Sequence, residues 1–306
     1  MIALLLRRMA TALPTLFVVL LLSFVLMRVA PGGPFDGERA LDPETRAALV
    51  AQFGLDKPVV EQFALYVGGI VRGEFGPSLV YRDFTVGDLV AQGLPVSLAL
   101  GGLALLLALV AGVPLGAAGA MRPGGWLDRL VSVLAIALNA VPSFVTAPLL
   151  ILLFSFTFAL LPASGWDIAR PSTLVLPVIA LALPTLGVTA RLTRAGQADV
   201  LKADFIRTAR ARGLSAAGIL RRHALKPALI PLVSYLGPAA AGLLTGAVVI
   251  ETVFALPGLG RYFVQGALNR DYPLVLAVVL LYAALILLFN LIADLLYGWL
   301  DPRVRT

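Results

Sequence analysis

The sequence predicts an all-α, polytopic membrane protein with six transmembrane helices. Of its 306 residues, 59% are hydrophobic and only 13% are charged, whereas about a quarter of the residues of a soluble domain are charged. Several uncharged runs exceed the roughly 18–20 apolar residues that a helix needs to cross a lipid bilayer. These runs are continuously apolar and do not alternate with polar residues, which argues against a β-barrel.

The first helix is predicted within residues 1–30. Arg7 and Arg8 precede an uncharged run from Met9 to Met27. A secretory signal has the same order of charges, but its apolar core is about 7–15 residues long and a small-residue cleavage site follows it. Here the run is longer, and Arg28 stands where cleavage would occur. We therefore expect an uncleaved helix whose N-terminus is cytoplasmic.

Residues 31–92 form the largest polar segment, with nine acidic and five basic residues. If the N-terminus is cytoplasmic, this segment is extracytoplasmic. Capping residues and apolar spacing predict two short helices in it, over 42–54 and 57–76. We interpret the segment as a helical flap on the membrane surface.

Residues 93–306 are predicted to form the five-helix core. The expected spans are 94–120, 130–162, 171–190, 227–250 and 273–293. Pro142 and Pro148 should kink the second of these five. Every short segment rich in Arg and Lys then lies on one face, which places both termini in the cytoplasm. The segment 251–272 is either a re-entrant scoop or a solvated loop.

The loop between two of these spans, residues 191–226, carries an excess of seven positive charges, equal to that of the whole chain. Its nine basic residues are Arg191, Arg194, Lys202, Arg207, Arg210, Arg212, Arg221, Arg222 and Lys226, against Asp199 and Asp204. The spacing predicts a helix over 197–212, a break at Gly213, and a second helix over 216–225 capped by Ser215.

The second helix of this loop should present a docking face. Ile219, Leu220 and His223 share one side, and Arg221 and Arg222 flank it. An apolar ridge with a charged rim suits docking into a cleft on another protein. The alternative is a surface-lying loop whose arginines hold lipid headgroups.

The loop resembles a motif of ABC importer permeases, which reads E-A-A, three residues, Gly, nine residues, I-x-L-P. Arg207, Thr208 and Ala209 stand at E-A-A, Gly213 at the glycine, and His223 and Leu225 at the Ile and Leu. Lys226 stands at the proline, with Pro227 one residue later. Arg for Glu and His for Ile depart from the motif but are typical of the peptide-permease branch.

Stretches along the whole chain, including RRMATALPTLF and VIETVFALPGLG, are similar to the B-type permease subunits of bacterial oligopeptide importers. The resemblance implies a type I ABC importer permease fold in the bacterial inner membrane. It also implies a second homologous permease subunit, two ATP-binding cassette ATPase subunits, an extracytoplasmic peptide-binding protein and an oligopeptide substrate. The ATPase-coupling residues would be Arg207, Ala209, Gly213, Leu214, Ser215, Ile219, Leu220, Arg221, Arg222, His223 and Leu225.

We expect no catalytic residue, cofactor or metal site in this chain. It has no cysteine and one histidine, and it contains no Gly-Lys pair for a Walker A motif. ATP and Mg²⁺ would therefore be bound by the partner subunits. The positive charge fits cytoplasmic loops and anionic headgroups, so we expect no nucleic acid partner.

Polar residues within the spans are candidates for function, and these are Asn139, Asn290 and Asp294. For Asp294 we expect pairing with an arginine or an interface role. Two other functions stay open: a secondary transporter driven by an ion gradient, and a membrane-embedded hydrolase.

Overall fold

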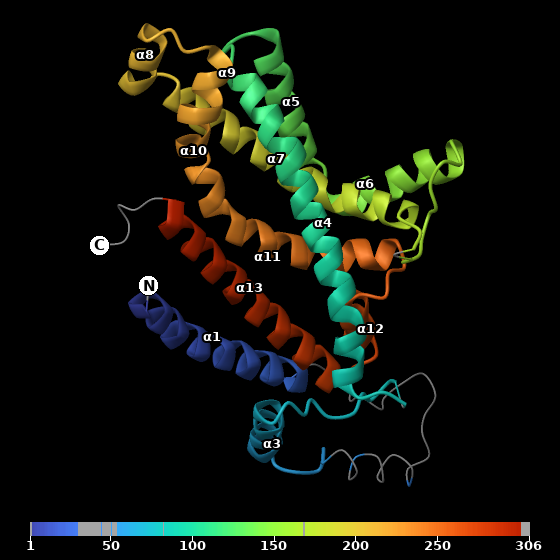
Figure 1. Ribbon diagram of the computed structural model, residues 1–306. Helices are drawn as coiled ribbons and strands as arrows, with labels where there is room; N and C mark the ends of the chain where they lie inside the picture. Colours follow the sequence, from blue (N-terminus) through green and yellow to red (C-terminus); the bar gives the residue numbers. More distant parts are fainter. Residues whose placement is uncertain are drawn as a thin grey trace.

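The computed structural model describes residues 2–29, 44, 50, 54–81, 83–167 and 169–300, and these residues are predominantly helical (Figure 1). The helices are α1 (Ile2–Val29), α3 (Val59–Val71), α4 (Val86–Ala120), α5 (Trp126–Ala140), α6 (Ser143–Leu150), the π-helix η1 (Ile151–Thr157), α7 (Ser172–Val200), α8 (Asp204–Ala211), α9 (Ala216–Ile219), the π-helix η2 (Leu220–Ala224), α10 (Leu225–Ala228), α11 (Ile230–Val253), α12 (Leu259–Leu268) and α13 (Tyr272–Leu300).

Five of these helices are long and apolar enough to cross a membrane, and a bent pair of helices brings the total to six. The predicted all-α membrane class is confirmed. The expected helix over 57–76 corresponds to α3. The expected helix over 42–54 lies almost wholly outside the described residues.

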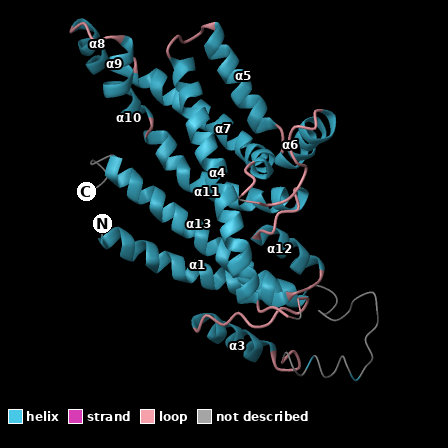
Figure 2. Cartoon of the chain, turned by 45° about the vertical axis from the view of Figure 1, so that its right-hand side comes forward, coloured by secondary structure: helices cyan, strands magenta, loops and turns pink. Residues whose placement is uncertain are grey.

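The two ends of the helical bundle differ (Figures 1 and 2). The α8–α10 loop lies at one end, together with the start of α1 and the end of α13, and we call this end the loop side. At the opposite end lies α3, so we call it the α3 side. The short helix α12 packs against α4, α11 and α13 toward the α3 side.

The centre of the bundle is the close contact of α4 with α7, which two glycines of α4 make possible. A Cβ at Gly112 would lie 2.9 Å from Thr189 Cβ. A Cβ at Gly116 would lie on the Ala190 carbonyl oxygen and 2.9 Å from Thr193 Cβ. Small residues therefore let the two backbones approach each other, as is common between membrane helices.

The third span differs from the prediction of a single kinked helix over 130–162. The chain bends by 98° between α5 and the α6–η1 pair. Val141 is extended, as expected before a proline, and Pro142 cannot donate a backbone hydrogen bond to continue α5. The pair of helices ends at Thr157. The break at Pro142 was predicted correctly, but its size was not, and Pro148 lies inside α6 without a break in the helix.

The predicted helix over 197–212 is also wrong. α7 continues ten residues past the expected end of its span, to Val200, and a turn separates it from α8. Ala203 is extended at the N-terminus of α8. This turn folds α8 back, so that Ile206 packs against Val200 and Leu201. Burial of these apolar side chains compensates for interrupting the helix.

Four of the described helices end in the same kind of turn. At the end of α8, Leu214 N–H donates to Ala209 O and Gly213 N–H to Arg210 O, which is a Schellman motif. Equivalent pairs of bonds close α3, α11 and α12. The residues of these turns in the left-handed region are Gly213, Gly73, Ala255 and Arg270, with φ of 76°, 79°, 54° and 58°.

Candidate functional site

The basic loop folds around a small core of its own. Ile206 and Ala209 of α8 are buried against Ile219 and Ala224. Leu220 packs beside them. The loop is therefore a compact knob with a fixed surface, and it lies at the same end of the bundle as the turn between α4 and α5 (Figure 2).

The turn between α8 and α9 is defined by two local features. Gly213 adopts its positive φ with open space around it, so its conformation alone requires glycine. Ser215 Oγ then accepts a hydrogen bond from Gly218 N–H at 3.2 Å, which caps α9 as predicted.

The predicted coupling residues are divided between the surface and the core of the knob. Arg207, Gly213, Leu214, Ser215, Arg222 and His223 are exposed, Leu220 and Leu225 are partly buried, and Ala209 and Ile219 are buried. The side chain of Arg221 lies outside the described residues. The interpretation of Ile219 as an exposed contact is wrong, because its side chain fills the loop's own core.

Phe205 is an exposed apolar residue of the loop that the sequence analysis did not single out. Its side chain is 49% exposed, and that of Leu214 is 39% exposed. Arg207, on the same helix as Phe205, pairs with Asp204 at 3.3 Å. Helical spacing alone could not have identified Phe205 as exposed, because it lies four residues before the buried Ala209 and therefore on the same side of α8.

Two contacts hold the base of the knob. Both carboxylate oxygens of Asp128, at the start of α5, bind the guanidinium of Arg194 on α7, with Nη2 at 2.8 Å from Oδ2. Gly124 N–H donates to the same carboxylate at 2.8 Å. Gly196 lets α10 approach α7, since a Cβ there would collide with the backbone of Ala228. These contacts connect α10 of the knob to α7, and α7 to α5.

We expect Asp128→Asn to lower the free energy of unfolding by about 1–3 kcal/mol, because it removes a charge-assisted pair from a carboxyl group that is almost completely buried. Thermal unfolding of the purified chain in detergent measures the loss. Asp167→Asn is the control, since the Asp167–Arg170 pair is exposed and such pairs contribute about 0–1 kcal/mol. Equal shifts in both variants would contradict this assignment.

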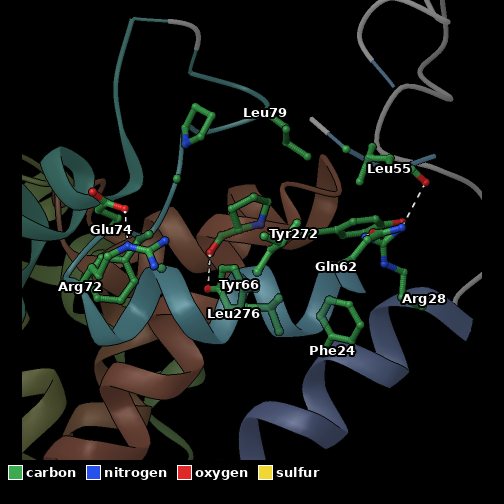
Figure 3. A pocket seen from close by; sticks show the side chains of 17 residues that line it. Phe24, Arg28, Leu55, Gln62, Tyr66, Arg72, Glu74, Leu79, Tyr272 and Leu276 are labelled. Atoms are coloured by element: carbon green, nitrogen blue, oxygen red, sulfur yellow. Dashed lines mark hydrogen bonds and ion pairs between the residues drawn. The ribbon is translucent and has the colours of Figure 1, made fainter. Parts of the chain in front are cut away.

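A pocket of about 460 Å³ lies on the α3 side, between the end of α1, α3 and the start of α13 (Figure 3). The guanidinium of Arg28 lies 5.4 Å from the ring centre of Phe24 and 5.6 Å from that of Tyr272. It also donates to Gln62. Tyr66 O–H donates to Pro273 O at 3.3 Å, and burial raises the pKa of the Tyr66 phenol above its usual range.

The polar segment is fastened to the bundle at a second point. Asp271, which precedes α13, is fully buried and accepts hydrogen bonds from Ser78 O–H and from Leu274 N–H. These groups are far apart in the sequence, so spacing alone could not identify them. α3 and the loop after it are thus anchored on the first turn of α13.

The polar residues predicted within the spans have different surroundings. Asp294 forms an ion pair with Arg8 of α1, as expected for pairing with an arginine. Asn290 packs against Gly237 of α11. Asn139 is exposed, directly before the break between α5 and α6.

Long apolar helices packed through glycines, with a folded basic knob on one side, are the features of a multi-pass membrane protein. The chain belongs to the family described as "Binding-protein-dependent transport system inner membrane component", whose model matches residues 112–306. The model of that family's N-terminal region matches residues 1–96. The chain is accordingly a multi-pass protein of the bacterial inner membrane.

Relatives and solved structures agree with this family. The chain is 48% identical to the oligopeptide transport system permease protein OppB of Salmonella typhimurium over 100% of both chains. It is 40% identical to the dipeptide transport system permease protein DppB of Bacillus subtilis, over 95% of this chain and 94% of the relative. An inward-facing structure of the MetNI methionine ABC transporter matches its fold with a TM-score of 0.60 at 20% identity, over 70% of this chain and 96% of the other.

Proposed function

We propose that the chain is a permease subunit of an ATP-driven oligopeptide importer. It forms half of the translocation pathway, and a second homologous permease subunit forms the other half. The observation that carries this proposal is the identity of 48% over the full length to an oligopeptide permease protein. The chain itself is not catalytic: two partner ATPase subunits bind ATP and Mg²⁺ and hydrolyse the nucleotide.

The knob formed by α8–α10 is the part that contacts an ATPase subunit. Its exposed Leu214 and His223, together with Phe205, supply a mixed apolar and charged surface, and Arg207 and Arg222 supply the rim. Its own buried core gives the surface a fixed shape. The ion pair of Asp128 with Arg194 then transmits the movement of the ATPases to the spans.

In this proposal the loop side is cytoplasmic, together with both termini, and the α3 side is extracytoplasmic. The excess of positive charge on the loop supports that orientation. The chain then divides into residues 1–30 with the first span, an extracytoplasmic segment over 31–92, and a core over 93–306 that contains the coupling loop 191–226. A peptide-binding protein delivers the substrate to the α3 side.

Co-purification and uptake test this function together. The chain is co-expressed with a second permease, two ATPases and the binding protein, and an affinity tag on this chain is used for purification. We expect one stable complex whose ATPase activity rises with binding protein and peptide, and which accumulates labelled peptides in proteoliposomes only with ATP. A chain that imports peptides without ATPase subunits would indicate a secondary transporter, and one that cleaves them alone would indicate a hydrolase.

A further inference from the structure

Glu251 lies in the last turn of α11, and its side chain is fully buried. Ser97 of α4 donates its hydroxyl to Oε1 at 2.6 Å. Gly260 N–H and Arg261 N–H, in the first turn of α12, donate to Oε2 at 2.7 and 3.3 Å. Leu259 N–H donates to Ser97 Oγ at 2.9 Å. One carboxylate and one hydroxyl therefore connect α4, α11 and α12.

Three glycines make room for this cluster. A Cβ at Gly258 would coincide with the Glu251 carboxylate, and one at Gly260 would lie 2.9 Å from its Oε2. On α4, a Cβ at Gly93 would lie 3.0 Å from Leu259 N and from the ring of Tyr262. The sequence from Glu251 to Gly260 is thus one structural unit, in which the glycines admit the carboxylate and the backbone of α12.

The carboxylate is a costly way to cap a helix. The residue at the N-cap of α12 is Gly258, which offers no side chain, although Ser or Asp there would satisfy the same N–H groups locally. Burying a carboxylate costs several kcal/mol, and among the described residues no Lys or Arg forms an ion pair with Glu251. The N–H donors and the positive end of the α12 dipole are the groups that offset this cost.

The desolvation cost of burying the Glu251 carboxylate is recovered when α12 moves away and water reaches the carboxylate. A carboxylate exposed to water regains its hydration, whereas an apolar side chain exposed in the same way is destabilised. The directional bonds fix one docked position of α12, and the hydration of the carboxylate lowers the free energy of undocking. The contact of α12 with α4 and α11 therefore has a single docked geometry, and α12 can still separate from these helices.

We propose that Glu251 is a positioning residue at the mouth of the proposed pathway, by which we mean its end on the α3 side. Glu251 holds α12 against α4 and α11 and lets it move away as a unit when the carboxylate becomes hydrated. This inference rests on the proposed function, since a releasable helix at the mouth serves a pathway that opens and closes. α12 then acts as a movable part of that mouth, and Ser97 is the fixed point on the opposite helix.

The position of α12 can be measured directly in the assembled complex. The chain has no cysteine, so Leu268→Cys on α12 and Val110→Cys on α4 introduce the only thiols of this subunit for spin labelling. Both side chains are exposed. Double electron–electron resonance in nanodiscs without ATP is expected to give one narrow distance distribution for otherwise unchanged protein.

Two variants of Glu251 should broaden that distribution in a defined order. Glu251→Ala leaves three donors unpaired and is expected to broaden it most. Glu251→Gln still offers an oxygen to the N–H groups of α12 without the charge, so we expect an intermediate result. We also expect the stimulation of ATPase activity by peptide and binding protein to fall about fivefold or more in Glu251→Ala, the size of a typical coupling between sites. Glu61→Ala, an exposed glutamate on α3, is the matched control and should leave the distance distribution narrow.

Ser97→Ala is the alternative variant for this test if the Glu251 variants do not assemble into the complex. It removes the hydroxyl but keeps the bonds from α12 to the carboxylate, so a smaller broadening in the same direction is expected. Narrow, unchanged distributions in the assembled variants, with normal stimulation, would overturn the proposal. If the unchanged complex shows no stimulation at all, the proposed function fails instead, while the distance distributions still decide whether Glu251 positions α12.

Discussion

Replacing Gly213 with proline is expected to abolish the stimulation of ATPase activity by peptide and binding protein. Gly213 has a φ of 76°, whereas proline is fixed near −65°, and proline also loses the N–H that donates to Arg210 O. The turn between α8 and α9 cannot then form, and the exposed face of the knob loses its shape. The measurement is ATP hydrolysis by the purified complex in proteoliposomes, with and without binding protein and peptide.

Gly73→Pro is the matched control for this variant. Gly73 closes α3 through the same pair of backbone bonds and has a φ of 79°, but it lies on the α3 side. It should leave basal ATP hydrolysis and the binding of the ATPases unaffected.

Charge reversal at Arg221 and Arg222 is expected to reproduce the loss of stimulation while membrane insertion stays normal. Full stimulation in Gly213→Pro would refute the assignment of the loop as the coupling element.

Gly116→Val is expected to destabilise the chain by about 3 kcal/mol or more, because its side chain would have to occupy the space of the Ala190 carbonyl and of Thr193. The contact between α4 and α7 is the closest in the bundle at this point, and backbone atoms cannot rotate out of the way as a long side chain can. We expect little folded protein in the membrane fraction. Thermal unfolding and size-exclusion chromatography in detergent measure the loss.

Gly102→Val on the same helix shows whether the effect is specific. A Cβ at Gly102 meets no atom within 4 Å, so valine there should leave both the yield and the melting temperature close to those of the unchanged chain. If Gly102→Val proved as damaging as Gly116→Val, the cause would be a general intolerance of α4 to β-branched residues, and the packing argument would fail.

The number and order of the spans could be predicted because apolar length alone determines them. The bend of 98° could not, since a proline such as Pro142 only interrupts the hydrogen bonding of a helix, while packing against neighbours sets the angle. Asp128 and Arg194 are 66 positions apart in the sequence, so their pairing depends on how α5 and α7 lie in space.

The sequence predicted where the candidate site lies in the chain, but it did not predict which of the site's side chains are exposed. Gly213 and Ser215 were identifiable because local chemistry determines turns and caps. Ile219 was misplaced, because a helix of four residues does not reveal which face the rest of the loop covers. Glu251 escaped notice for a related reason: a charged residue at the end of an apolar run usually marks the boundary of a span, and only the fold buries it.

The turns that close α8, α11 and α12 differ in the conformational energy of the residue in the left-handed region. Only the first places glycine in the left-handed region; the other two place Ala255 and Arg270 there, at about 1–2 kcal/mol each. Both strained residues adjoin α12, one before it and one after it. In the described part of the chain, the one other non-glycine residue with a positive φ is Ala159, so most of the backbone strain of this kind lies on either side of the short helix α12.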